Sequence, residues 1–420
     1  MDHAAQRIAT EKATAPAAVG AARQVFPMIA LLAPDVADQF DLVAFDPRGW
    51  GESAPIDCVD DEAMETLLAS DLTPDDEAEW GVTVDLLQGL ADGCVERSGD
   101  RIAHIDSESV ARDMDLVRAA MGDEQLSFLG ISYGTLTGAL YATLFPEKVR
   151  AFVLDSPVAP AESAIEFVGR QADASEVELG RFLDDCAADA DCAFQGGEGE
   201  SALQEAFDAL LASAEDAALP AGDQDLSASL LQAGTISFLR SGEWEALASG
   251  LADTAAGDGT ALFGAASGMF GRSADGTWSN FLEVFEPMVL LDYGCPDGFD
   301  VEAAQDVSAD LAARVPRVGA TAAAVGALCA VWAVERPTAR LPIDASEAPP
   351  MLVLAGRHDQ STPYDFVGSF MEALGNDSYL VTWEGTGHGV SNRNMCTISA
   401  TVGFLVDPTA PPAADTCPAE

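Results

Sequence analysis

The chain has 420 residues, of which 48% are hydrophobic, so it can bury a large core and is not generally disordered. Asp and Glu outnumber Lys and Arg by 70 to 20, which gives a formal net charge of −50. A surface this negative repels nucleic acid and anionic membranes, and we expect neither as a partner. We interpret the charge as a solubility feature of a secreted or salt-adapted protein; attraction of cationic substrates is the alternative.

Short apolar runs bounded by turn residues predict the strands of a buried sheet. One group lies at 41–45, 126–131 and 150–155, and a second group at 350–355 and 378–383. Their hydrophobicity is continuous rather than alternating, which is typical of parallel strands that are buried on both faces.

Helices are predicted between these strands. Apolar residues recur at helical spacing from Val110 to Met121, and Gly122 ends this helix. A second helix is predicted over 135–144, before Pro146. The alternation of strands and helices indicates an α/β fold.

The region 159–340 differs from the rest of the chain. It is rich in Ala, Asp, Glu, Leu and Gly, and it lacks comparable buried strands. We therefore predict a first part of the core at 1–158, a helical cap insertion at 159–340 and a C-terminal part of the core at 341–420. The longest uncharged run, 318–334, is too short and too weakly apolar for a membrane span, so we expect no stable membrane insertion.

The eight cysteines fit four disulfides, although their connectivity is open. The simplest pairing joins sequence neighbours and indicates an oxidising compartment; the alternative is eight buried free thiols. None lies in a C-x-x-C pair, and with only four histidines in the chain we expect no zinc site. The N-terminus shows no signal peptide, so we expect a mature form or a truncated start. The cysteines are Cys58, Cys94, Cys186, Cys192, Cys295, Cys329, Cys396 and Cys417.

Residues 130–134 form a G-x-S-x-G pattern centred on Ser132. In a glycine-rich chain this pattern also occurs by chance in ordinary loops. A serine hydroxyl becomes a good nucleophile only when a base takes its proton and a carboxylate orients that base. The remainder of the chain must therefore supply a histidine and an acid.

Two of the four histidines are well placed to be the base. His3 lies in an irregular tail, and His104 lies far from any strand end. His358 and His388 each follow a predicted strand, at the carboxyl edge where α/β sites gather. His388 stands between glycines that let a loop carry the imidazole over a pocket. His358 is adjacent to Asp359, so the two side chains would point in different directions.

The order Ser132, Asp359, His388 is the chain order of α/β-hydrolases and differs from that of chymotrypsin-like and subtilisin-like proteases. Singly, these residues have ordinary explanations as a loop serine, a capping carboxylate and a surface histidine. Together, each after a strand, they predict a triad of nucleophile, orienting acid and general base.

Several sequence blocks resemble the secreted tripeptidyl aminopeptidases, which are α/β-hydrolases related to proline iminopeptidase. The resemblance runs from about Phe40 to Cys417. The blocks are FDLVAFDPRGWGES, CVERSGDRIAHIDSESVARDMDLVRAAMG, FLGISYGTLTGALYATLFPEKVRAFVLDSP, LCAVWAVERP, PPMLVLAGRHDQSTPYDFV and EGTGHGVSNRNMC.

The resemblance implies an α/β-hydrolase fold, a mostly parallel sheet flanked by helices, with an inserted helical cap. It implies secretion and hydrolysis of short amino-terminal peptides or prolyl bonds through an acyl-enzyme on Ser132, with no metal or cofactor. The substrates would be peptides with a free N-terminus. It also implies a disulfide between Cys396 and Cys417, and identifies Cys295 and Cys329 as cap cysteines.

One part of the family pattern is altered. The family's G-G-P-G-G-S-G loop supplies one backbone N–H of the oxyanion hole, and the nearest segment here, 14–20, keeps only its proline and final glycine. The other donor, the backbone N–H of Tyr133, is expected to remain. The residues before Asp41 are too few for the family's N-terminal strands, which we expect to be missing or degenerate. Two alternative functions remain. One is a carboxylesterase on the same triad, since the fold hosts many chemistries, and the other is a catalytically impaired peptide-binding homologue that lacks its oxyanion loop.

Overall fold

The computed structural model describes residues 40–420 except 71, 73, 75, 161 and 197–200. The predictions that concern His3, the segment 14–20 and the N-terminal strands lie outside the described residues. The chain forms two compact units, each built from separated segments. The first unit comprises the described part of Met1–Pro55, Ala103–Glu162 and Arg336–Glu420, and the second comprises Ile56–Ile102 and Ser163–Glu335.

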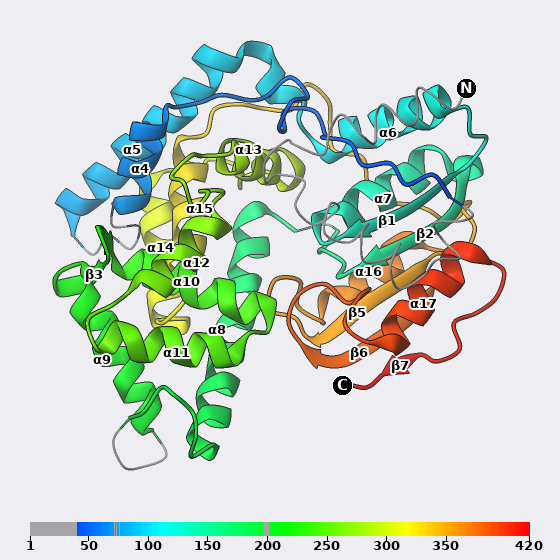
Figure 1. Ribbon diagram of the computed structural model, residues 1–420. Coiled ribbons are helices and arrows are strands. Elements are labelled where there is room, and N and C mark those ends of the chain that lie inside the picture. Colours follow the sequence, from blue (N-terminus) through cyan, green and yellow to red (C-terminus); the bar gives the residue numbers. More distant parts are fainter. Residues whose placement is uncertain (1–39, 71, 73, 75, 161, 197–200) are drawn as a thin grey trace. The chain divides into compact units, whose positions relative to one another are not determined.

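A five-stranded parallel sheet forms the centre of the first unit within the described range (Figure 1). Its strand order is β1-β2-β5-β6-β7. Because every neighbouring pair is parallel, the carboxyl ends of all strands lie at one edge. The strands are β1 (Leu126–Ile131), β2 (Val149–Asp155), β5 (Leu352–His358), β6 (Tyr379–Thr386) and β7 (Thr416–Cys417). The helices of this unit are α6 (Ser107–Met121), α7 (Tyr133–Leu144), η2 (Pro146–Lys148), α16 (Phe366–Leu374) and α17 (Met395–Val406).

The predicted fold class is confirmed: the sheet is mainly parallel and flanked by helices. The predicted strand 126–131 coincides with β1, and the later apolar runs correspond to β2, β5 and β6. The helix predicted to end at Gly122 is α6, whose N-cap Asp106 accepts a hydrogen bond from the Ser109 N–H. Gly122 adopts the left-handed conformation, at φ 87°, that commonly ends a helix.

The predicted strand at 41–45 is wrong. These residues form no strand, and none of them is fully buried. An apolar run indicates burial, whereas a strand also needs a neighbouring chain with which to share hydrogen bonds. Within the described part of the chain, no segment pairs with residues 41–45.

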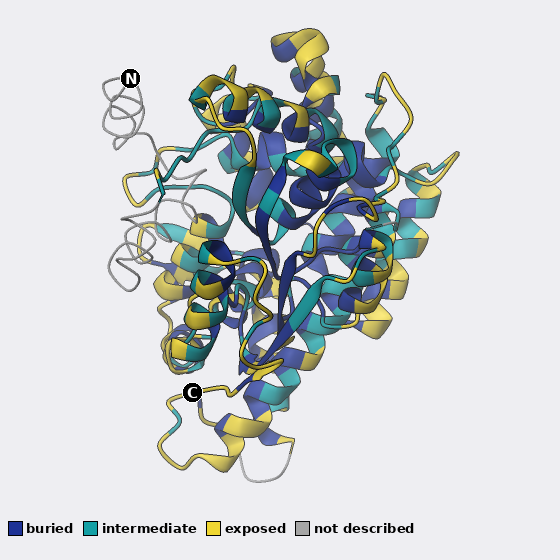
Figure 2. Cartoon of the chain, turned by 90° about the vertical axis from the view of Figure 1, so that its right-hand side faces the viewer, coloured by how far each residue is buried: buried dark blue, intermediate teal, exposed yellow. Residues whose placement is uncertain are grey.

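Helices α7 and α17 cover opposite faces of the sheet. Alternate residues of a strand point to opposite faces, so Val153 and Leu154 of β2 face different helices. A Cβ added to Gly138 of α7 would lie 2.6 Å from Leu154 Cδ2, which shows how closely α7 approaches. On the other face, Phe404 of α17 belongs to the same buried cluster as Val153. The central strands β2 and β5 are accordingly mostly buried, whereas the outward faces of the helices are exposed (Figure 2).

The second unit is mostly helical. Its described strands form only the short antiparallel hairpin β3–β4. None of the helices among the described residues is long and apolar enough to cross a membrane. The helix η1 (Gly99–His104) spans the point in the sequence where the second unit gives way to the first. The elements of the second unit are α4 (Asp61–Ala69), α5 (Glu77–Ser98), α8 (Ala164–Ala188), α9 (Ala202–Asp216), β3 (Leu219–Ala221), β4 (Gln224–Leu226), α10 (Ala228–Ser241), α11 (Trp244–Ala255), α12 (Thr260–Met269), α13 (Phe281–Tyr293), α14 (Val301–Arg314) and α15 (Ala320–Val331).

The segment 56–102 belongs to this helical unit, although the sequence analysis placed it in the first part of the core. Helix α5 packs against α15, and buried Glu283 of α13 accepts hydrogen bonds from the N–H groups of Cys58 and Val59 at 2.6 and 3.0 Å. Local composition gave no sign of these contacts, because the partners lie more than 200 residues away in the sequence.

All eight cysteines form disulfides, and each pairs with its sequence neighbour. The pairs are Cys58–Cys94, Cys186–Cys192, Cys295–Cys329 and Cys396–Cys417. The alternative of eight free thiols is therefore wrong. The pairing of Cys396 with Cys417, which the resemblance implied, is confirmed.

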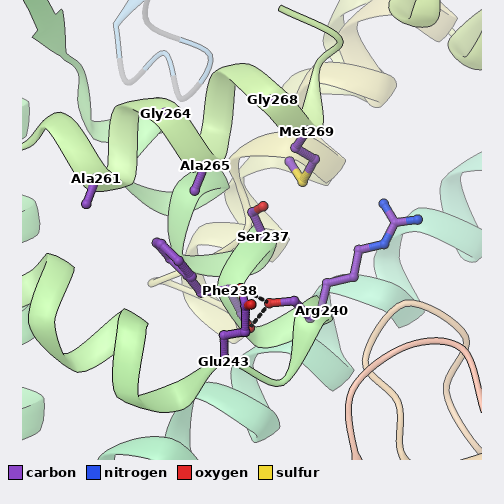
Figure 3. Close-up of a pocket in the computed structure, with 10 residues that line it drawn as sticks. Ser237, Phe238, Arg240, Glu243, Ala261, Gly264, Ala265, Gly268 and Met269 are labelled. Atoms are coloured by element: carbon purple, nitrogen blue, oxygen red, sulfur yellow. Dashed lines mark hydrogen bonds between the residues drawn. The ribbon is translucent and has the colours of Figure 1, made fainter. Parts of the chain in front are cut away.

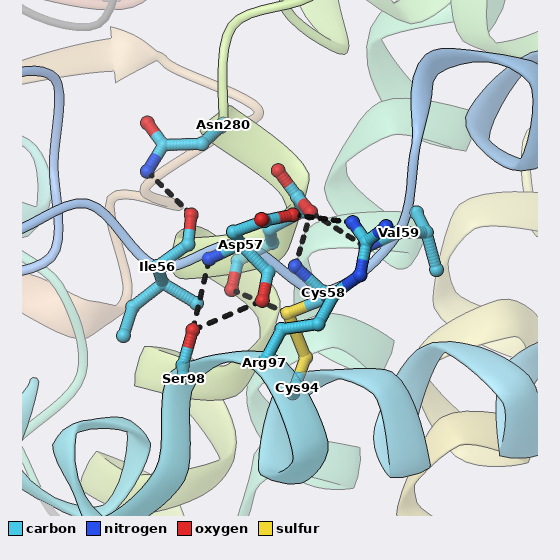
Figure 4. Close-up of a disulfide and its surroundings, with 9 residues drawn as sticks. Ile56, Asp57, Cys58, Val59, Cys94, Arg97, Ser98 and Asn280 are labelled. Carbon is cyan, nitrogen blue, oxygen red and sulfur yellow. Dashed lines mark hydrogen bonds and ion pairs between the residues drawn. A yellow bond between two sulfur atoms is a disulfide. The ribbon is translucent and has the colours of Figure 1, made fainter.

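The disulfide Cys58–Cys94 lies where an extended segment crosses α5 (Figure 4). The crossing is so close that a Cβ added to Gly93 would lie 2.1 Å from the carbonyl oxygen of Cys58. Ser98 continues the contact, because its hydroxyl accepts from the Asp57 N–H and donates to the Asp57 carbonyl. Glycine is required at position 93 to let the two segments meet.

We expect Gly93→Ala to lower the free energy of unfolding by about 1–3 kcal/mol, the usual cost of forcing an extra carbon into a packed contact. Gly89→Ala, in the same helix, is the matched control, since a Cβ there meets nothing within 4 Å. That substitution should raise helix stability by up to about 1 kcal/mol. Thermal or urea unfolding of the oxidised proteins measures both. Equal effects of the two substitutions would contradict the close crossing.

Glu286 of α13 is a carboxylic acid that titrates far from its ordinary range. Only part of Glu286 is exposed to solvent, and the residue precedes Pro287, which lies inside the helix. Burial raises the pKa of Glu286 to about 7. Since the unfolded chain releases this proton at a lower pH, ionisation of Glu286 destabilises the folded state as the pH rises toward its folded pKa.

We expect Glu286→Gln to stabilise the protein, and the gain to grow between about pH 5 and pH 7 and then stay constant. Below the unfolded pKa both states are protonated, so the gain should vanish. At pH 8 it should be about 1–3 kcal/mol: a tenfold change in proton affinity corresponds to roughly 1.4 kcal/mol, and solvent around the partly exposed carboxyl group reduces the full effect of the raised pKa. Glu372→Gln, which removes an exposed carboxylate from α16, is the control. Unfolding midpoints from pH 5 to 8 measure both; parallel pH curves for the two variants would refute the raised pKa.

Candidate active site

Ser132 occupies a strained turn between β1 and α7. Its backbone lies at φ 57° and ψ −122°, a conformation that L-residues rarely adopt. Such strain costs of order 1–3 kcal/mol and persists only where the surroundings hold it. Here the Ser132 N–H donates to the Asp155 carbonyl at 2.8 Å, and the Ser132 carbonyl accepts from both the N–H and the hydroxyl of Thr135. The serine predicted to be a nucleophile therefore stands at the carboxyl end of a strand, on a fixed main chain.

The two glycines of the G-x-S-x-G pattern have different roles. A Cβ added to Gly130 would lie 2.5 Å from Phe128 Cε1 and 2.6 Å from the Gly134 carbonyl oxygen. A Cβ added to Gly134 would meet nothing within 4 Å. Only the first glycine is thus required for the strand to approach the helix this closely.

Asp359 and His388 form a hydrogen-bonded pair. The Nδ1 atom of His388 lies 2.8 and 3.0 Å from the two carboxylate oxygens of Asp359. The carboxylate also accepts from the N–H groups of Ser361 and Thr362 and from the Thr362 hydroxyl. Burial acts to raise the pKa of Asp359, but the adjacent His388 and these hydrogen bonds outweigh it, so the pKa lies below its ordinary value. A carboxylate that stays ionised holds the imidazole with Nδ1–H as donor.

The loop that carries His388 approaches the serine turn. A Cβ added to Gly389 would lie 3.8 Å from Cγ2 of Ile131, the residue before Ser132. The side chain of His388 is 6% exposed, and its Nε2 atom is buried without a hydrogen-bond partner in the described structure. An unpaired imidazole nitrogen whose ring is oriented by a carboxylate can accept a proton from a hydroxyl. No hydrogen bond joins the Ser132 hydroxyl to Nε2 among the described residues.

The other residues considered in the sequence analysis, two histidines and the oxyanion donor, lie as follows. His104 ends η1, and its carbonyl accepts from Arg48. His358 ends β5, and its carbonyl accepts from the Gly387 N–H. Tyr133, the predicted oxyanion donor, is the first residue of α7, so its N–H lies at the positive end of the helix dipole.

Asp155, which ends β2, is a buried polar residue of this edge that the sequence analysis missed. It is fully buried, and its carboxylate accepts hydrogen bonds from Val390 and Ser391 in the loop after His388. The signal was an acidic residue at the end of a buried apolar run. The apolar run by itself predicts only a strand at 150–155.

Two other features bear on where a ligand could bind. In the described part of the chain, no group of three or more His, Cys, Asp or Glu residues is arranged to hold a metal ion. A groove of about 420 Å³ lies on the helical unit between α10 and α12 (Figure 3). None of the predicted catalytic residues lines it. Its lining residues are Ser237, Phe238, Arg240, Ser241, Glu243, Ala261, Gly264, Ala265, Gly268 and Met269.

Comparisons with known proteins agree with this geometry. A family profile described as alpha/beta hydrolase fold matches residues 20–391. The chain is 31% identical over 371 residues to a tripeptidyl aminopeptidase of Streptomyces lividans, covering 86% of this chain and 67% of that protein. It is 30% identical over 395 residues to the serine protease Hip1 of Mycobacterium tuberculosis, covering 91% and 75%. It is also 33% identical over 411 residues to carboxylesterase B of Mycobacterium tuberculosis, covering 93% and 76%.

We expect Gly130→Ala to lower the free energy of unfolding by about 1–3 kcal/mol, because the added methyl group overlaps Phe128 and the Gly134 carbonyl. Gly134→Ala is the matched control within the same pattern and should not destabilise the fold. Urea unfolding followed by circular dichroism measures both. The steric account fails if Gly134→Ala is the more destabilising substitution.

Proposed function

The chain belongs to the α/β-hydrolase family, and we propose that it is a serine peptidase that removes short peptides from the N-termini of its substrates, of the tripeptidyl or prolyl aminopeptidase type. The observation that carries the proposal is the buried Asp359–His388 pair at the same sheet edge as the strained Ser132 turn. Relatives named tripeptidyl aminopeptidase and serine protease support the proposed peptidase activity.

In the proposed mechanism, Ser132 attacks the carbonyl carbon of the scissile bond. His388 Nε2 takes the serine proton and then donates it to the leaving amine, while Asp359 holds the ring through Nδ1–H and stabilises the imidazolium. The main-chain N–H of Tyr133 faces the developing oxyanion, where the helix dipole adds favourable charge. Water, activated by the same histidine, then hydrolyses the acyl-enzyme.

The substrate class and location are further parts of the proposal. We infer peptides with a free N-terminus as substrates, no nucleic-acid or membrane partner, and an extracellular protein. The four disulfides support the location, because such bonds persist in oxidising compartments. No cofactor is needed for acyl transfer of this kind.

Carboxylesterase activity is the second candidate, because a relative of that name shares 33% of its residues with this chain over 411 positions. A single triad can act on both esters and peptides, since the fold hosts many chemistries. The non-catalytic alternative rests on the altered segment 14–20, which lies outside the described residues.

A fluorophosphonate probe tests the nucleophile. We expect it to label the oxidised protein stoichiometrically, and to fail with Ser132→Ala, because only an activated serine attacks the probe. Ser369→Ala, which removes an exposed hydroxyl of α16 and keeps Ser132, serves as the control for specificity and should remain labelled. Absence of labelling in correctly oxidised wild-type protein would exclude the catalytic proposal.

Substrate panels separate the peptidase from the esterase. Tripeptidyl and aminoacyl anilides with a free N-terminus should be hydrolysed with a higher kcat/KM than the same anilides after N-acetylation. Short acyl esters should be poorer substrates than the free tripeptidyl anilides. Hydrolysis of esters alone would favour the carboxylesterase.

A further inference from the structure

Asp155 connects the main chains that carry the predicted nucleophile and the predicted base, and we propose that it is a positioning residue of this site. It ends β2, the strand between β1 and β5, and it is fully buried. The inference rests on the proposed function, because it concerns how Ser132 and His388 are set against each other.

The backbone of Asp155 holds the serine turn. Ile131 pairs with Asp155 in the register of β1 and β2, and the Ser132 N–H donates to the Asp155 carbonyl at 2.8 Å. This hydrogen bond continues the ladder one residue beyond the end of β1. It fixes Ser132 just where the chain takes its positive φ.

The side chain of Asp155 holds the loop of the base. Its two oxygens accept from the Val390 N–H at 2.8 and 3.0 Å, and Oδ2 also accepts from the Ser391 N–H at 2.8 Å. The Ser156 hydroxyl donates to Oδ1 at 3.0 Å and accepts from the Gly389 N–H at 3.1 Å. Three consecutive backbone N–H groups after the histidine thus bind one carboxylate and its neighbouring hydroxyl.

Arg393 holds the same loop through its carbonyl groups. Its guanidinium donates to the carbonyl oxygens of His388 at 2.5 Å and Gly389 at 2.6 Å, and it lies over the ring of Trp383. The loop is therefore bound on its N–H side by Asp155 and on its C=O side by a cation. Asp155 also binds the serine turn, because its carbonyl accepts from the Ser132 N–H.

Because the Val390 and Ser391 N–H groups both point at the side chain of residue 155, that side chain must present two acceptor oxygens and no donor. An asparagine would keep one oxygen, but its amide would present N–H to a loop that offers N–H. Relief of that contact would move the loop, and with it the imidazole, relative to the serine hydroxyl. A displacement near 1 Å of a reacting group can cost about 100-fold in rate.

Asp155→Asn tests the role against a matched control. Asp106 is also a buried carboxylate of the sheet unit; it caps α6 through the Ser109 N–H and pairs with Arg336 at 3.0 Å. We expect Asp155→Asn to lower the second-order rate of fluorophosphonate labelling by about 10- to 100-fold in folded protein. Asp106→Asn should lower the unfolding midpoint without changing that rate. Equal labelling rates in folded Asp155→Asn and wild type would overturn the proposal.

A spectroscopic measurement distinguishes positioning from stability. The proton on His388 Nδ1 is expected to give a low-field ¹H resonance, because it is hydrogen-bonded to the Asp359 carboxylate. Asp155→Asn should shift or broaden this resonance. Asp106→Asn should leave it in place. An unshifted resonance in folded Asp155→Asn would count against the positioning role.

A second, milder variant keeps the test informative if Asp155→Asn misfolds. Ser156→Ala removes only the hydroxyl between Asp155 and Gly389, and it should slow labelling by several-fold while shifting the same resonance. No change in either readout would overturn the proposal even if Asp155→Asn does not fold. If wild-type protein itself is not labelled, the proposed function fails, whereas the resonance still reports whether Asp155 positions the imidazole.

Discussion

The parallel hydrogen bonding of β1, β2, β5 and β6 is the constraint on which the site depends. Because the four strands run in one direction, the residues that follow them meet at a single edge. The chain crosses this edge four times, at Ser132, Asp155, Asp359 and His388. An antiparallel neighbour would have sent one of these residues to the opposite edge, so the direction of pairing determines which side chains can meet.

The same edge concentrates strain and buried charge. Ser132 and Ser156 both have positive φ, and Asp155 and Asp359 are both buried carboxylates. Backbone N–H groups, side-chain hydroxyls and one imidazole bind these carboxylates in place of lysine or arginine. Burial raises the pKa of Asp155, and the hydrogen bonds from Ser391 and Val390 offset this only in part. Such features persist where the surrounding structure holds them, and they cluster at functional sites.

Much of this edge could be predicted from the sequence, for physical reasons. The continuously apolar run at 126–131 located β1 to the residue, and chain order linked Ser132 with two later residues. The failures share a cause: apolarity reports burial but not the partner. Residues 41–45 lack a pairing strand in the described structure, and the hydrogen bonds of Asp155 reach residues 235 and 236 positions away, which no local pattern records.

The large negative charge makes covalent bonds useful in both units. With a formal charge of −50, repulsion between the acidic side chains destabilises the compact state. Disulfides offset this loss of stability, because they restrict the unfolded chain. Three of the four disulfides lie in the helical unit, which has no large sheet among its described residues. The fourth joins α17 to β7, a strand of two residues that pairs with β6 at Trp383. A strand this short has too few hydrogen bonds to stay paired alone. The disulfide therefore holds β7 against β6, the strand that leads to His388.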